Sequence, residues 1–174
     1  MRVLPYALGV ALGALPVLAA AQNPVSDAFR ASEQRYARNL DSALALFPAD
    51  KSTYKPTPAQ MSVADIAVHL AEGNDMLCSS VGGTTAPQRT PVTAATPRNE
   101  LLARVHETFA YCQTALANLA DGQMADSVPS FGGRKSTRGN MLLITLGDWA
   151  DHYSQLAIYL RLNGMLPPTA RRQD

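Results

Sequence analysis

A stripe of polar side chains near the C-terminal end of the chain has the residue types and spacing needed for chemistry. Its members recur every three or four residues and therefore share one side of a helix: Thr145, Asp148, His152, Gln155 and Tyr159. Apolar residues border the stripe on both sides, so we expect it to face the protein interior and to need polar partners there. Asp148 and His152, four residues apart, could hold a metal ion together. The alternative is an intrahelical ion pair, which the spacing alone favours if the stripe faces solvent.

His69 is the other histidine that the pattern places toward the interior. It lies on the inner edge of a predicted helix, between Ile66 and Gly73. A single histidine in that position is more often a hydrogen-bonded core residue than a metal ligand. His106 borders the apolar face of another predicted helix, and we interpret it as a surface residue. The sequence lacks a G-x-S-x-G motif, a glycine-rich phosphate loop and a C-x-x-C-H haem motif.

The periodicity of apolar residues predicts four helices and almost no strand. The first is expected over Asp27–Phe47 with Ser26 as its N-cap, and the second over Val63–Ser79 with Ser62 as its N-cap. The third begins at Pro97 after the cap Thr96 and ends near Asp121, and the fourth covers Arg138–Asn163, before Gly164 and the pair Pro167–Pro168. Segments 79–96 and 122–137 are predicted to be loops. The fold class is therefore all-α, a four-helix bundle.

The last helix also resembles a known family. Its run H-Y-S-Q-L-A-I-Y-L-R-L-N-G-M-L-P-P, from His152 to Pro168, is similar to the last core helix of DinB-like metal-binding four-helix bundles. The family pattern H-x-x-x-H-x-x-Q-L matches at His152, Gln155 and Leu156, but its first histidine is replaced by Asp148. The family's third ligand falls on His69. The resemblance covers about residues 27–168 and implies a DinB-like bundle with a metal site.

The ligand set implied by this resemblance is His69, Asp148 and His152. Two imidazoles and a carboxylate suit Zn²⁺, Ni²⁺ or Fe²⁺ and leave coordination positions open. The shorter aspartate could also disrupt the site. Gln155 and Tyr159 are candidates for contacting the ligands or a substrate, while a solvated surface position is an equal alternative for Gln155.

The N-terminal residues 1–21 have the features of a signal peptide. Arg2 provides the positive charge, Val3–Leu18 is mostly apolar, and Ala19–Ala21 fits the cleavage rule. We expect cleavage after Ala21, a mature domain of residues 22–174 and export to a periplasm or beyond, with no stable membrane insertion afterwards. An uncleaved membrane anchor is the alternative.

The charge and the cysteines limit the partners of the exported domain. Without Arg2 it carries 14 basic and 14 acidic residues and no basic run, so we expect no nucleic-acid partner. Cys78 and Cys112 are predicted to form a disulfide, because an oxidising compartment favours pairing, and this bond would be worth about 3–4 kcal/mol. Two buried free thiols are the alternative. A homodimer is left open.

Two functional classes follow. The first is a metal-dependent hydrolase or transferase of unknown small-molecule substrate; some DinB-like relatives activate a cytoplasmic thiol, for which an exported protein has no obvious supply. The second is a non-catalytic exported protein that binds a small ligand and has a degenerate metal site. The sequence does not decide whether the protein is an enzyme.

Overall fold

The computed structural model describes residues 22–171. The predicted signal peptide, residues 1–21, lies outside the described residues. Four long helices dominate the described part, which confirms the all-α four-helix bundle: α1 (Pro24–Leu46), α2 (Val63–Gly82), α3 (Arg98–Leu116) and α4 (Arg138–Leu162). Short 3₁₀ turns lie between and after them, at Ala49–Lys51, Asp121–Gln123, Phe131–Gly133 and Pro168–Ala170.

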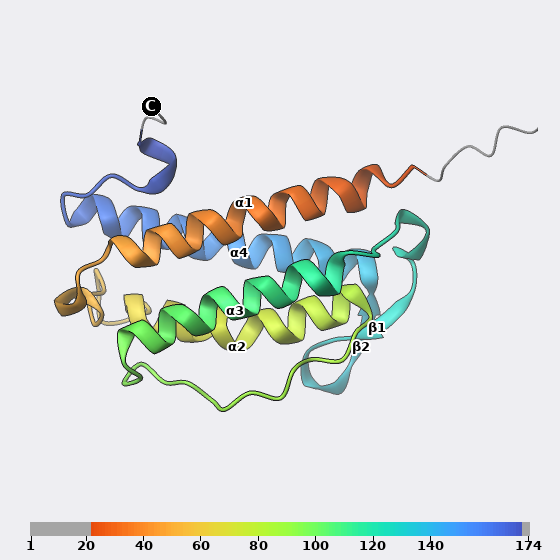
Figure 1. Cartoon of the computed structure of the whole chain (residues 1–174), viewed down its shortest axis with the longest axis horizontal. Coiled ribbons are helices and arrows are strands. Elements are labelled where there is room, and N and C mark those ends of the chain that lie inside the picture. Colours follow the sequence, from red (N-terminus) through yellow and green to blue (C-terminus); the bar gives the residue numbers. More distant parts are fainter. Residues whose placement is uncertain (1–21, 172–174) are drawn as a thin grey trace, which may run out of the picture.

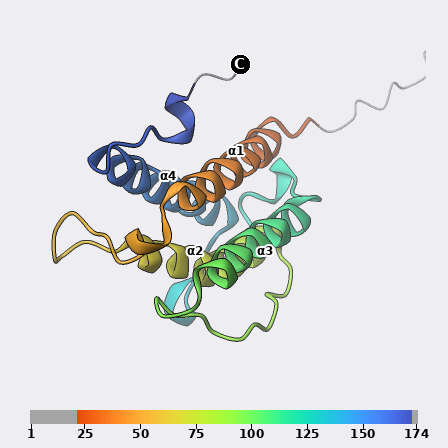
Figure 2. The same cartoon turned by 60° about the vertical axis from the view of Figure 1, so that its left-hand side comes forward.

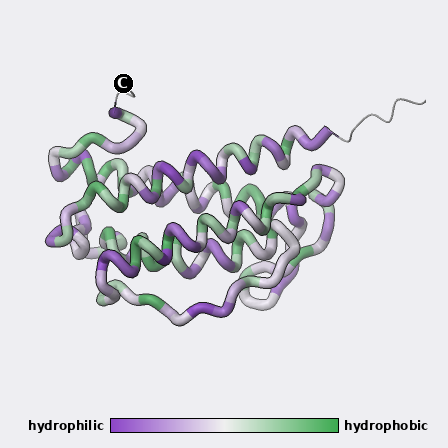
Figure 3. Tube along the Cα trace, viewed as in Figure 1, coloured by the Kyte–Doolittle hydropathy of each residue, from purple (hydrophilic) through white to green (hydrophobic). Residues whose placement is uncertain are grey.

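The helices pack as two pairs, α1 beside α4 and α2 beside α3 (Figures 1 and 2). Contacts of α1 with α3 and of α2 with α4 close the bundle, so each helix has two neighbours. The long connection 83–97 runs along the outside of α2 and α3 (Figure 1). Along each helix, short hydrophobic and hydrophilic stretches follow one another (Figure 3). Within residues 22–171, no helix is both long and apolar enough to cross a membrane.

Of the three predicted N-caps, one is confirmed and two are wrong. Ser62 forms the expected capping box with Asp65, because each side chain accepts a hydrogen bond from the other residue's backbone N–H. Ser26 is wrong as the cap of α1: the helix begins earlier, at Pro24, and the buried Ser26 hydroxyl donates to Asp121. Thr96 is also wrong, because its hydroxyl accepts from the backbone N–H of Thr93 and α3 begins later. The partner of Ser26 lies 95 residues away in the sequence, which local spacing does not reveal, whereas Thr96 closes a local turn with Thr93.

The segment predicted as an irregular loop after α3 contains a small antiparallel hairpin. Strands β1 (Ser127–Pro129) and β2 (Lys135–Thr137) pair with Val128 opposite Ser136. Val128 is buried, and the hydroxyl of Ser80 in α2 donates to the carbonyl of Pro129. The hairpin covers the end of α2, and these contacts stabilise it. Helix α2 extends beyond the predicted end at Ser79, and α3 ends before the predicted end near Asp121.

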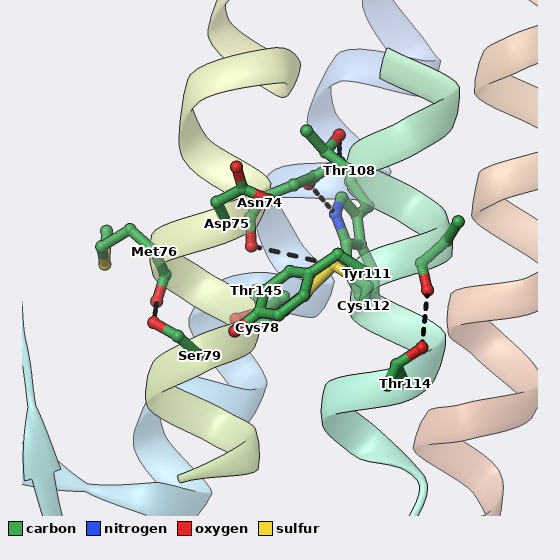
Figure 4. The surroundings of a disulfide bond; sticks show 12 residues. Asn74, Asp75, Met76, Cys78, Ser79, Thr108, Tyr111, Cys112, Thr114 and Thr145 are labelled. Atoms are coloured by element: carbon green, nitrogen blue, oxygen red, sulfur yellow. Dashed lines mark hydrogen bonds between the residues drawn. A yellow bond between two sulfur atoms is a disulfide. The ribbon is translucent and has the colours of Figure 1, made fainter. Parts of the chain in front are cut away.

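A disulfide joins the paired helices α2 and α3. It links Cys78 with Cys112, whose Cα atoms are 5.1 Å apart, as predicted from the sequence (Figure 4). Both residues are fully buried.

Trp149 of α4 occupies the centre of the bundle and contacts all three other helices. Its ring stacks on Phe29 of α1 at 5.7 Å between centroids and lies 5.8 Å from the ring of Phe109 in α3. Its indole N–H donates to the side-chain oxygen of Asn74 in α2 at 2.8 Å, and the Asn74 amide donates to Thr108 at 3.1 Å. These contacts fix the rotation of α4 and therefore the direction of its polar stripe.

Candidate metal centre

The polar stripe of α4 meets α2 at His69. The Nε2 atom of His69 lies 3.1 Å from Oδ1 of Asp148, and Nε2 of His152 lies 3.4 Å from the same oxygen. The two imidazole rings are 4.5 Å apart between centroids. One potential ligand atom from each residue falls within 4.8 Å of the others, so the three side chains named from the sequence form one cluster that could hold a metal ion.

The three residues differ in their access to solvent. The side chain of His69 is 45% exposed, that of Asp148 is 20% exposed and that of His152 is 7% exposed. The site therefore opens to solvent on the α2 side and closes toward the core. Oδ2 of Asp148 and Nδ1 of His152 are buried and have no hydrogen-bond partner within residues 22–171. A buried carboxylate oxygen without a donor is costly, and a cation would satisfy it.

The electrostatics keep the carboxylate ionised. Burial alone would raise the pKa of Asp148, but hydrogen bonds with His152 and His69 outweigh it and lower the pKa from 3.8 to about 2. The hydrogen bond with Asp148 in turn raises the pKa of His69 above its usual 6.5. A negative charge held between two imidazoles is an environment that favours a bound cation.

The spacing of the donor atoms suits a divalent metal. Bonds of about 2.0–2.1 Å in a tetrahedral site put neighbouring ligand atoms roughly 3.4 Å apart. Two of the three separations, 3.1 and 3.4 Å from Asp148 Oδ1, agree with that value, and the ligand atoms of the two histidines lie within 4.8 Å of each other. The residues present therefore fit the metal implied by the fold, even though Asp148 replaces the first histidine of the family pattern.

The remaining residues of the stripe lie outside this cluster. Gln155 donates to Asp151 on its own helix at 2.7 Å, and Tyr159 donates to the carbonyl of Met61 at 3.0 Å. Neither forms a hydrogen bond to the triad within the described chain, so their predicted role at the site remains a prediction. Thr145 donates to the carbonyl of Met141. His106 is largely exposed and pairs with Asp41 at 3.0 Å, in agreement with its interpretation as a surface residue.

Sequence reasoning missed Glu33. This α1 residue is 1% exposed, and its Oε1 has no hydrogen-bond partner within residues 22–171. Burial raises its pKa from 4.5 to about 7, although the charge of Arg38 partly opposes the rise. The signal was its position four residues after Phe29 and seven before Leu40, on the apolar face of the helix.

Two hollows on the described surface lie away from the triad. One, of about 280 Å³, is walled by α2 and the 86–92 connection and includes Glu72 and Arg89. Another, of about 370 Å³, lies between α1 and α3 beside Asp41 and His106. Solvent therefore reaches the triad beside the half-exposed ring of His69 rather than through either of these hollows.

Solved structures and a family model with similarity to this chain identify its family. It is similar to a DinB-like protein from Bacillus subtilis with 19% identity and a TM-score of 0.64, covering 84% of this chain and 99% of the other. A DinB-like protein from Bacillus cereus is similar with 15% identity and a TM-score of 0.66, over 82% of this chain and 95% of the other. No curated protein matches the sequence. The model of the DinB superfamily matches residues 33–156, which is most of the chain and includes all three triad residues. The chain therefore belongs to the DinB superfamily.

Proposed function

We propose that this protein is an exported metal-dependent hydrolase or transferase that binds one divalent metal ion, Zn²⁺, Ni²⁺ or Fe²⁺, through His69, Asp148 and His152. The observation that carries the proposal is the convergence of three donor atoms from two helices within 4.8 Å. Export rests on the signal-peptide pattern of residues 1–21.

The chain's own residues would define both the charge and the access of the site. Asp148 is ionised and supplies the negative charge, while His152 anchors the site on the core side. His69 is half exposed, so a small molecule would approach beside its ring. A bound divalent metal would lower the pKa of a coordinated water or thiol and so supply a nucleophile at neutral pH.

Metal analysis of the protein purified without chelators from its native compartment tests the site. Wild-type protein is expected to contain about one equivalent of metal, and His152→Ala should lower that content. Asp148→His should preserve or increase it, because it restores the family pattern. His106→Ala is the matched control, since His106 is an exposed histidine outside the triad, and it should leave metal content unchanged. The proposal fails if wild-type protein offered Zn²⁺, Ni²⁺ and Fe²⁺ binds none of them.

One observation favours the second candidate, a non-catalytic protein that binds a small ligand. The two hollows described above do not include the triad in their walls, so a substrate cavity beside the metal is not provided by either. The Co²⁺-substituted protein separates the candidates. Added azide should shift its visible absorption if a coordination position is open, as an enzyme requires. An unchanged spectrum would favour the non-catalytic alternative.

A further inference from the structure

Glu33 presents an unusual buried acid on the inner face of α1. Four buried side-chain atoms within residues 22–171 lack a hydrogen-bond partner, and three of them belong to Glu33, Asp148 and His152. The fourth belongs to Arg138, at the start of α4 beside the hairpin. Buried carboxylates without a partner are destabilising and call for a specific explanation. Two of these three residues already belong to the candidate metal centre.

The packing of α1 against α4 puts Glu33 at the height of His152. The helices run in the same direction (Figure 1), and the stack of Phe29 on Trp149 fixes their relative position. Glu33 lies four residues, or about 6 Å, beyond Phe29, and His152 lies three residues, or about 4.5 Å, beyond Trp149. Both side chains are buried in the core. The two unpartnered groups therefore lie at one level of the bundle, on neighbouring helices.

Two buried polar residues elsewhere in the core already have hydrogen-bond partners. Asn74 bonds with Trp149 and Thr108, and the hydroxyl of Thr145 donates to a carbonyl of its own helix. Within residues 22–171, Glu33 Oε1 is thus a buried acceptor without a donor, as is Oδ2 of the proposed ligand Asp148. His152 turns Nε2 toward Asp148 and leaves Nδ1 unpartnered in the interior.

A histidine that binds a metal through one ring nitrogen usually donates its other N–H to a carboxylate or carbonyl, which holds the ring in place. We propose that Glu33 is this acceptor for His152: a positioning residue that receives the Nδ1–H hydrogen bond when Nε2 binds the metal. The inference deepens the proposed function and rests on it. It assigns to α1, which carries no ligand, the orientation of the buried ligand.

Two substitutions separate this role from simple packing. Glu33→Leu keeps a side chain of similar size but removes the acceptor, whereas Glu33→Gln retains one acceptor oxygen. Ser80→Ala is the matched control, because it removes a buried hydrogen bond at the hairpin end of α2, away from the triad. The measurements are the Co²⁺ dissociation constant of the mature protein, its ligand-field spectrum, and the ¹⁵N NMR signal of His152 Nδ1–H in the Zn²⁺-loaded protein.

Glu33→Leu should weaken Co²⁺ binding about 10- to 100-fold and shift the ligand-field bands. Glu33→Gln should lose less affinity and move the Nδ1–H signal from its wild-type position, because a neutral amide oxygen replaces the carboxylate as the acceptor. Ser80→Ala should bind Co²⁺ as wild type does. Wild-type affinity and an unchanged spectrum in Glu33→Leu would overturn the inference while leaving the metal site intact. If Glu33→Leu does not fold, an unchanged Nδ1–H signal in Glu33→Gln overturns it. Failure of wild-type protein to bind Co²⁺, Zn²⁺, Ni²⁺ or Fe²⁺ would instead refute the metal site itself, and the inference with it.

Discussion

Glu33→Gln should stabilise the metal-free protein more at alkaline pH than at acidic pH. Burial raises the pKa of Glu33 from 4.5 to about 7, so the folded protein retains a proton that the unfolded chain has released between these values. For an acid whose folded pKa is raised, stability is undiminished below the unfolded pKa and falls as pH rises through this window. Glutamine has nearly the same shape and carries no charge at any pH.

The magnitude follows from the shift. The rise of the Glu33 pKa from 4.5 to about 7 corresponds to a loss of about 3 kcal/mol in unfolding free energy, and this penalty is nearly complete at pH 8. At pH 5 the penalty is about 1 kcal/mol, because this pH lies only slightly above the pKa of the unfolded chain and the folded protein keeps its proton. The difference in unfolding free energy between Glu33→Gln and wild type should therefore rise by about 2 kcal/mol between pH 5 and pH 8.

Urea unfolding of the chelator-treated, disulfide-intact mature protein measures this difference. The single tryptophan, Trp149, is fully buried and reports unfolding by its fluorescence. Glu100→Gln, on the exposed surface of α3, is the control and should show no comparable change between the two pH values. A Glu33→Gln effect that is the same at pH 5 and pH 8 would refute the reasoning, because the carboxyl would then not be held in a desolvated site.

Three further predictions concern other parts of the chain. Replacing Cys78 and Cys112 together by alanine should lower the urea unfolding free energy by about 3–4 kcal/mol, from loss of the cross-link; an unchanged midpoint would contradict this. Gly82→Ala should destabilise the protein in thermal unfolding, because the added Cβ would overlap the backbone carbonyl of Ala115, and a wild-type Tm would be the contrary result. Mass spectrometry of the exported protein should find Gln22 as the first residue, whereas an intact N-terminus would indicate an uncleaved anchor.

Much of the fold could be predicted because helices are encoded locally. The apolar repeat of about 3.6 residues predicted all four helices, and the Ser62–Asp65 capping box required only residues three apart. The predicted N-cap Ser26 failed for the opposite reason. Ser26 takes its partner, Asp121, from a segment 95 residues away, which no local pattern reveals.

Part of the candidate site could likewise be recognised in the sequence, and part depends on the tertiary structure. The i, i+4 spacing of Asp148 and His152 on one helical stripe, and the family pattern that includes His69, could be recognised in the sequence. Only the tertiary structure decided that His69, 79 residues from Asp148, lies 3.1 Å from its carboxylate. The physical reason is the packing of Trp149, which sets the rotation of α4 against its neighbours. Glu33 shows the same dependence, because helix packing, rather than residue type, decides that a glutamate is buried.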